Sequence, residues 1–419
     1  MKARDWFTAM EKMVSTRMCM GFVLMLIGLL TPAVQYAAGG VIAKGTVMVS
    51  TGSGLVTEYD QTGTNLGQID TTTGSANTAG SEFDSAGNFF VTDFQAQQVT
   101  KFDPTGALIG SFGSGYNADP ESVFFDAAGN VYVGQADGTH NVLEFDPSGT
   151  LLNTFSPATE DRGTDWVEIA ADQCTLFYTS EGVLVKRFNA CTNTQLTDFN
   201  TAPLPGTNAY AHRLLPSGGI LVADTSEVVR LDASGNQIQT YSLPGTSLLF
   251  AVNLDPDGTS FWTADLFSGE VFKVDIASGS ILQQWSSAGA AGFTAAGGLS
   301  VKGEIVVGGN CVSFSPSTID FGNVKLNTTK KKVLTLTNNC TAKVVIGAVS
   351  FTNVTGDPAD FSSHEYCNQA GGGVLKVGKS CTIGVFFSAD EVDTDTATLN
   401  VAISAPGSAI QVPVTATEK

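Results

Sequence analysis

Three aspartates that occupy equivalent places in a repeating pattern carry the most recognisable chemistry of this sequence. Asp93, Asp224 and Asp265 each end a short apolar run and begin a polar link. Carboxylates gathered on one face of a protein can bind a divalent cation or a basic partner. The alternative is that each aspartate caps the turn after its own strand. Apart from a divalent cation held in this way, the sequence indicates no cofactor.

A second set contains the groups that acid–base catalysis would need. His212 lies at the start of one apolar segment, and Glu121 and Asp165 lie one residue before the corresponding places in two others. If the three side chains meet, they could transfer protons in a common pocket. The alternative is that His212 is a packed or solvent-facing residue. No Ser-His-Asp spacing, phosphate loop or EF-hand loop is recognisable in the chain.

The elements that must position these residues belong to a repeat of 43 residues. Each unit has two apolar runs joined by a polar link and followed by a turn. A period near 40 with four strands per unit is typical of β-propeller blades. The next pair of marker positions would begin at Ser317, where the turn is absent, so we expect six blades; a seven-bladed ring with one incomplete blade is the alternative. The turns are marked by Asp60, Asp103, Asp146, Asn189, Asp232 and Asp275.

The marker residues have a structural explanation. An Asp or Asn side chain can accept hydrogen bonds from backbone N–H groups a few residues further on, and glycine adopts the left-handed conformation that closes a hairpin. Gly63, Gly106, Gly149 and Gly235 occupy that place in four units. We therefore predict that the marker aspartates stabilise turns.

The first unit begins at Gly45 with what should be its second strand. Its inner strand must therefore come from elsewhere in the chain. Residues 297–309, GGLSVKGEIVVGG, resemble the start of a repeat without a continuation. We expect this segment to complete the first blade and close the ring. It offers two strands where one is missing, and the sequence does not distinguish between them.

Units such as GNFFVTDFQAQQVTKFDPTG and GGILVADTSEVVRLDASG resemble those of NHL-type six-bladed propellers, over residues 45–309. This superfamily neighbourhood includes streptogramin lyase-like and gluconolactonase-like enzymes. The resemblance implies that catalytic groups would gather where inner strands meet at a central channel, and that metal-assisted chemistry would need several carboxylates or histidines there. Only one inner-strand start is ionisable among Gly80, Ser122, Trp166, His212, Ala251 and Gly297.

At Cys311 the 43-residue period stops and longer alternating strands begin. Residues such as Leu334 and Leu336 share one face, and about a hundred residues of such strands indicate an immunoglobulin-like sandwich. SPSTIDFGNV, LTLTNN and LKVGKSCTIGVFFSAD resemble bacterial ASH/MSP-like domains of the choice-of-anchor D type, over residues 311–417. We expect residues 313–321 and 333–338 to pair antiparallel. The tip of this hairpin would consist of Lys330, Lys331 and Lys332.

Six cysteines remain once Cys19, in the N-terminal apolar run, is set aside. An even number in an exported chain suggests three disulfides. The absence of a CxxC pair argues against a zinc site. The expected bridges are Cys174–Cys191, Cys311–Cys340 and Cys367–Cys381. The first follows from the loss of turn residues in the fourth unit. The expected strand pairing places Cys311 near Cys340, which leaves Cys367 with Cys381, and other pairings stay open.

Residues 1–39 have the pattern of a secretory signal, because a 13-residue apolar run follows four basic residues. The run is shorter than the roughly 20 residues that a spanning helix needs. We therefore expect no membrane span after signal removal, and a secreted, periplasmic or cell-surface protein. The expected all-β chain comprises the signal, a propeller over residues 40–310 and a sandwich over residues 311–419.

The negative charge is concentrated in the repeats. Residues 40–310 contain 9 basic and 29 acidic residues, a net charge of −20, whereas residues 311–419 have 8 and 9. Such a field repels nucleic acid and favours cations or basic partners. The sequence thus predicts a non-enzymatic binding or scaffold protein whose acidic propeller contacts a protein or small-molecule ligand. The alternative is a metal-assisted lyase or lactonase acting at the channel mouth.

Overall fold

The computed structural model describes residues 41–419 except 75–76, 217, 288–295, 308–311, 317, 339–342, 366, 368–372 and 404–408. The expected signal sequence lies outside the described residues. The described chain is built from strands, with one short 3-10 helix before β29. Among the described residues, no helix is long and apolar enough to cross a membrane.

Six four-stranded antiparallel sheets are described between Val47 and Val301. Five of them are meanders of consecutive strands, as the repeat predicts. The first three sheets are β24(Gly298–Val301), β1(Val47–Ser50), β2(Leu55–Tyr59) and β3(Asn65–Asp70); β4(Thr78–Phe83), β5(Phe89–Asp93), β6(Gln98–Phe102) and β7(Leu108–Phe112); and β8(Pro120–Phe125), β9(Val131–Gln135), β10(Val142–Phe145) and β11(Leu151–Phe155). The next three are β12(Val167–Ile169), β13(Thr175–Tyr178), β14(Lys186–Asn189) and β15(Thr194–Gln195); β16(Ala209–Leu214), β17(Ile220–Asp224), β18(Glu227–Leu231) and β19(Gln237–Ser242); and β20(Leu249–Leu254), β21(Ser260–Asp265), β22(Glu270–Asp275) and β23(Ile281–Ser286).

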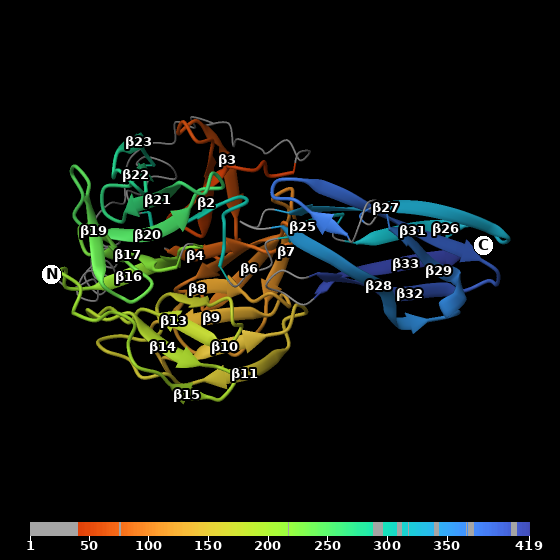
Figure 1. The fold of residues 1–419 in the computed structure, drawn as a ribbon, viewed down its shortest axis with the longest axis horizontal. Coiled ribbons are helices and arrows are strands. Elements are labelled where there is room, and N and C mark those ends of the chain that lie inside the picture. The colour runs from red at the N-terminus through yellow and green to blue at the C-terminus, as the bar shows by residue number, and fades with distance from the viewer. Residues whose placement is uncertain are drawn as a thin grey trace, which may run out of the picture. The chain divides into compact units, whose positions relative to one another are not determined.

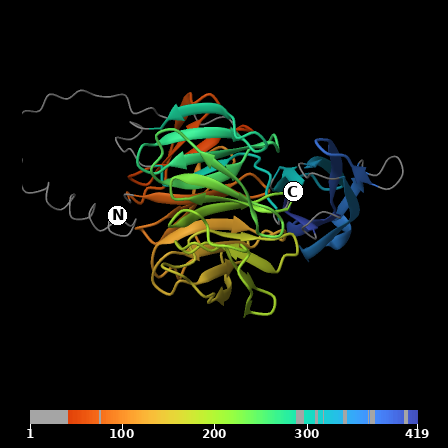
Figure 2. The same ribbon diagram turned by 60° about the vertical axis from the view of Figure 1, so that its left-hand side comes forward.

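The first strands of these sheets lie beside one another in a closed circuit. β4 contacts β8, the contacts continue through β12, β16 and β20, and β24 lies beside both β20 and β4. In Figure 1 the labels β4, β8, β16 and β20 are central, while β11, β15, β19 and β23 lie at the rim. Figure 2 shows the same sheets from a second direction.

The circuit is closed by the segment that the sequence indicated. β24 pairs antiparallel with β1, so that Val301 lies opposite Val47 and Gly298 lies opposite Ser50. The first of the two strands offered by residues 297–309 is therefore the one that completes the first sheet.

The marker residues form the turns between the third and fourth strands. Asp103 Oδ1 accepts hydrogen bonds from the backbone N–H groups of Thr105 at 2.8 Å and Ala107 at 3.0 Å. Gly106, with φ of +79°, closes this turn in the left-handed region. These geometries confirm the turn interpretation. The same pair of backbone bonds recurs at Asp60, Asp146 and Asp232.

Adjacent sheets bury their apolar faces against one another. Between the second and third sheets, Phe90, Phe125, Val133 and Phe145 form one such layer. Phe90 packs edge-on against Phe125, with ring centroids 4.9 Å apart. Burying one such side chain contributes about 1.5–3 kcal/mol, so the layers between sheets contribute substantially to the apolar stabilisation.

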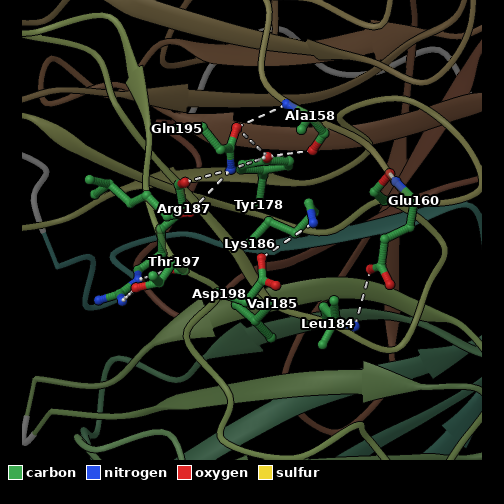
Figure 3. Close-up of polar contacts among 12 residues, drawn as sticks. Ala158, Glu160, Tyr178, Leu184, Val185, Lys186, Arg187, Gln195, Thr197 and Asp198 are labelled. Atoms are coloured by element: carbon green, nitrogen blue, oxygen red, sulfur yellow. Dashed lines mark hydrogen bonds and ion pairs between the residues drawn. The ribbon is translucent and has the colours of Figure 1, made fainter.

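The fourth sheet departs from the others because its outer strand, β15, has only two residues. Side chains secure this edge instead (Figure 3): Gln195 Nε2 donates to the Arg187 carbonyl at 2.9 Å, and the Tyr178 hydroxyl donates to the Ala158 carbonyl at 2.6 Å. A disulfide joins Cys174, directly before β13, to Cys191, just after β14. This bridge confirms the pairing expected from the missing turn residues.

The C-terminal part is a sandwich of two sheets. Their facing sides form one core, in which Leu334, Leu336, Ile383, Leu399 and Val401 are buried as the alternating pattern predicted. One sheet has the order β25(Val312–Ser315), β27(Thr328–Asn338), β31(Ser380–Ala389) and β29(Phe361–Glu365). The other has the order β26(Ile319–Val324), β33(Ala409–Glu418), β32(Thr394–Ile403), β28(Val344–Thr355) and β30(Val374–Leu375), and helix η2(Pro358–Asp360) precedes β29.

The disulfide between Cys367 and Cys381 is present in the sandwich, as expected. The expected Cys311–Cys340 bridge lies outside the described residues.

The structure corrects the expected first hairpin of the sandwich. β25 does pair antiparallel with β27. The chain then passes to the other sheet, where β26 pairs parallel with β33. Pro316, between the two strands, lacks an N–H group and cannot continue a hydrogen-bonded ladder. The expected hairpin tip is also wrong, because Lys330 pairs with Phe387 of β31 and all three lysines are exposed residues of β27.

Candidate functional site

Asp93, Asp224 and Asp265 are the last residues of β5, β17 and β21, and all three are fully buried. Asp265 caps its own hairpin, accepting hydrogen bonds from the backbone N–H groups of Phe267 and Ser268. Its other oxygen accepts from Leu248 N–H at 2.7 Å, in the segment that leads into the same sheet. Asp265 therefore has a structural role.

The other two aspartates bind the segment entering their sheets. Asp224 Oδ2 accepts from Gly206 N–H at 2.6 Å, and Asp93 Oδ2 accepts from the hydroxyls of Thr71 and Thr73. The second oxygen of each carboxyl is buried without a hydrogen bond. Burial raises the pKa of Asp224 to about 6, with a further contribution from Glu227. Asp93 and Asp224 thus each have one carboxylate oxygen that makes no hydrogen bond within the protein.

Glu121 and Asp165 belong to one buried cluster of charged groups. Glu121 lies in β8 and Asp165 shortly before β12, and each is 1% exposed. Burial is the largest cause raising the pKa of Glu121, to about 8, although Arg162 opposes it. Burial and the neighbouring Glu121 raise the pKa of Asp165 well above its ordinary value. Glu121 therefore favours its protonated form near neutral pH.

Arg162 is the cation of this cluster. Its guanidinium lies 2.6 Å from Asp137 and 3.1 Å from Glu181, and its carbon atom lies over the ring of Phe94 at 5.2 Å from the centroid. Glu121 Oε2 and both oxygens of Asp165 have no hydrogen-bond partner. The arrangement is thus acidic overall, with buried oxygens that could hold protons or contact a ligand.

The structure does not join His212 to this cluster. Both ring nitrogens are buried without a hydrogen-bond partner, so no hydrogen bond connects His212 with Glu121 or Asp165. Burial, followed by the charge of Arg213, lowers the pKa of His212 to about 3. A neutral imidazole at pH 7 agrees with the interpretation of His212 as a packed residue.

A second charged network, centred on Arg213, was not expected from the sequence. Arg213 is 1% exposed and lies 2.8 Å from Glu82 of β4 and 2.9 Å from Glu304, which follows β24. Glu304 also accepts hydrogen bonds from the Asn253 amide and the Leu254 N–H. The network thus connects four segments that are far apart in the sequence.

The signal for this network is present in the inner strands, one or two positions beyond the row of inner-strand starts named above. Glu82, Arg213 and Asn253 face Phe90, Leu221 and Trp262 across their sheets, and Glu168 faces Phe177 in the same way. The first strands β4, β8, β16 and β20 each have a register shift near their start. A period of 43 aligns Glu82 with Glu168, but it does not align either of them with Arg213 or Asn253.

In the described part of the repeats, the side chains that could bind a metal do not form a cluster. No three His, Cys, Asp or Glu side chains come within ligating distance of one another there; the group that does so lies in the sandwich. The repeats place carboxyls beside Arg162 and Arg213 instead.

Comparison with known proteins supports the two-part architecture. Residues 310–417 match the family described as HYDIN/CFA65/VesB-like, Ig-like domain. The chain has no match among curated proteins. A structure of a nidogen/laminin complex is 13% identical, with a TM-score of 0.50, over 62% of this chain and 98% of the other. A protein of unknown function from Bacteroides caccae is 14% identical, with a TM-score of 0.50, over 61% and 98%. At these identities the likeness concerns the propeller-like fold alone.

Proposed function

We propose that this protein is a secreted, periplasmic or cell-surface binding or scaffold protein without enzymatic activity. In this proposal residues 40–310 form a six-bladed NHL-type propeller and residues 311–419 form a domain of the ASH or choice-of-anchor D type. The propeller presents the binding surface, and the sandwich acts as spacer or docking module.

The observation that carries the proposal is a row of exposed aliphatic side chains on the outer strands, spaced by the repeat. Ile109, Leu152, Ile238 and Ile281 are 57%, 47%, 53% and 40% exposed. Leu66 occupies the same place in the first sheet, and Gln195 replaces the aliphatic residue in the fourth. Because these side chains are exposed, packing within the protein does not explain why aliphatic residues recur at equivalent positions. We call the five aliphatic residues the rim row.

The rim row lies in the part of the chain that carries the net charge of −20. Exposed apolar side chains in a part of the protein with a net negative charge suit a partner that combines apolar residues with basic ones, because the apolar contacts add affinity while the opposite charges speed association. Glu181 forms an ion pair with Arg162, and Glu82 and Glu304 form ion pairs with Arg213, which agrees with a structural use of these buried charges.

The rim row can be tested by affinity capture from the envelope fraction of the source organism. We expect partners held by the wild-type chain to be lost by the double variant Ile109→Glu, Leu152→Glu. A matched variant, Val374→Glu with Val377→Glu, alters two exposed aliphatic residues of the sandwich and should retain them. Retention should also weaken as salt rises from about 0.1 M to about 0.5 M. A captured set that is identical for both variants would contradict the proposal.

A second candidate, a metal-assisted lyase or lactonase, is favoured by the unpartnered oxygens of Glu121 and Asp165. Turnover of lactones and cyclic esters by the purified protein, before and after chelation, distinguishes the two functions. The binding proposal expects no turnover. Chelator-sensitive turnover that Asp165→Asn abolishes would establish the second function instead.

A further inference from the structure

Three carboxylates from different parts of the C-terminal sandwich come together in its interior. Asp360 ends helix η2 directly before β29, Asp395 lies near the start of β32, and Glu418 ends β33. One oxygen of each lies within 4.8 Å of the others. The residues are 3%, 0% and 1% exposed, so water does not solvate them as it would surface acids.

Four of the six carboxylate oxygens of this cluster have no hydrogen-bond partner in the protein. Asp360 Oδ2, both oxygens of Asp395 and Glu418 Oε1 are buried without a hydrogen bond. An unpaired buried carboxylate costs several kcal/mol unless something neutralises it. No ion pair described in the structure involves any of the three residues.

The charged groups with the largest effect on the carboxylate cluster are acidic. Residues 311–419 contain nine acidic residues and eight lysines. Seven of the nine acids either form the cluster or are among the groups with the largest electrostatic effect on it. They are Asp357, Asp360, Asp390, Glu391, Asp393, Asp395 and Glu418. The acidic residues of the sandwich are therefore concentrated around this cluster.

Backbone contacts hold the cluster in place. Glu418 Oε2 accepts hydrogen bonds from the N–H groups of Glu391 at 2.8 Å and Asp390 at 3.2 Å, whereas Oε1 is buried without a hydrogen bond. Gly356 has φ of +83°, and a Cβ added there would lie 1.5 Å from Asp395 Oδ1. The backbone thus approaches Asp395 at a distance that only glycine permits.

From this geometry we propose that Asp360, Asp395 and Glu418 form a calcium site. All the ligating atoms are oxygens, which selects a hard cation over zinc or copper. Ca²⁺ accepts six to eight oxygens in flexible geometry, including bidentate carboxylates, whereas Mg²⁺ usually retains several waters and binds through one or two carboxylates. Asp393, whose Oδ1 is also buried without a partner, is a further candidate ligand.

Calcium at this place connects the two sheets of the sandwich. Asp360 leads into β29 of one sheet, while Asp395 and Glu418 belong to paired strands of the other. The ion therefore stabilises the folded sandwich, because a ligand that binds the folded state alone raises its stability by mass action. This inference does not depend on the function proposed for the propeller.

The competing explanation is that protons rather than a cation neutralise the carboxylates. Burial and nearby acids raise the pKa of Asp360 to about 7 and that of Asp395 to about 6. Measurements at about pH 8 separate the explanations, since there the carboxyls are largely ionised and a cation has the least competition from protons.

The test is calorimetric titration of CaCl₂ into the full chelator-treated chain at about pH 8, together with thermal unfolding. We expect one Ca²⁺ per chain, and a rise of roughly 10 °C in the unfolding midpoint of the sandwich at calcium concentrations about 100-fold above Kd. Asp395→Asn and Glu418→Gln should each lower the affinity at least tenfold. Asp320→Asn, which changes an exposed carboxylate of the same domain, should bind as the wild type does.

Two results would overturn the proposal. One is the absence of both binding heat and a calcium-dependent midpoint in the wild-type chain. The other is binding that Asp395→Asn and Glu418→Gln leave unchanged. Because both variants replace a charge by an amide of the same shape, they should fold, and their unfolding in the absence of calcium confirms it. Mg²⁺ at the same concentration should shift the midpoint less than Ca²⁺ does.

Discussion

The buried carboxyls of the propeller give its stability a pH dependence at the scale of single residues. Glu121 has an ordinary pKa of 4.5 and a folded-state pKa of about 8, mainly because it is buried. Arg162 lowers its pKa, while Glu181, Asp137 and Asp119 raise it. Between these two pH values the folded protein holds a proton that the unfolded chain releases, so stability decreases as pH rises through that range.

We therefore expect the unfolding midpoint of the propeller to fall from about pH 5 to about pH 8, and Glu121→Gln to flatten this decline because an amide cannot ionise. Thermal unfolding followed by circular dichroism at a series of pH values measures both. Asp70→Asn, at an exposed position, is the control. A decline that is as steep in Glu121→Gln as in the wild type would refute the assignment.

At the residue scale the sequence predicted turn chemistry better than buried chemistry. Asp103 and its equivalents stand at a fixed interval beside a glycine, so their hydrogen bonds follow from local spacing. The pairing of Arg213 with Glu82 and Glu304 depends on strands from opposite ends of the repeat region. Asp360, Asp395 and Glu418 likewise share no motif, although four acids among residues 390–395 were a signal in an otherwise balanced segment.

At the scale of elements, a disulfide stabilises the fourth sheet, in which the outer strand is too short to form a full ladder. β15 is short, and Cys174–Cys191 fixes the hairpin of β13 and β14. We expect the double variant Cys174→Ser, Cys191→Ser to lose about 3 kcal/mol in the chain-entropy model. In a domain of this size the loss corresponds to roughly 6–10 °C in the unfolding midpoint.

Differential scanning calorimetry measures this loss, and the same double replacement at Cys367 and Cys381 provides the comparison. It should lower the transition of the sandwich and leave that of the propeller in place. An unchanged propeller midpoint in the Cys174 and Cys191 variant would show that the side-chain contacts around Tyr178 and Gln195 suffice for the fourth sheet.

Elements were predictable where one local rule decides them. The four-stranded meanders follow from the 43-residue spacing, and β24 follows from the partial repeat at residues 297–309. The course of β26 could not be predicted in the same way. Both sheets of the sandwich offer buried apolar faces to Ile319 and Phe321, and which sheet accepts the strand depends on β33, almost a hundred residues further on.

At the scale of the whole molecule, the described residues form separate hydrophobic cores. The core of the sandwich consists of residues from 312 to 416, whereas the layers between the propeller sheets draw on residues from 42 to 301. Domains with their own cores usually unfold separately. We expect two calorimetric transitions for the full chain, of which added Ca²⁺ raises only the one that belongs to the sandwich. A single transition that moves as a whole would show that the two parts unfold together.

The pairing of β24 with β1 sets the order in which this protein can be completed. Val47 pairs with Val301, so during synthesis from the amino end the other five repeat sheets can form before the β24–β1 ladder does. Contacts between such distant residues form slowly. Until then β1 presents an open edge to other nascent chains, and a product truncated before Gly298 keeps that edge for its lifetime, with the attendant tendency to aggregate.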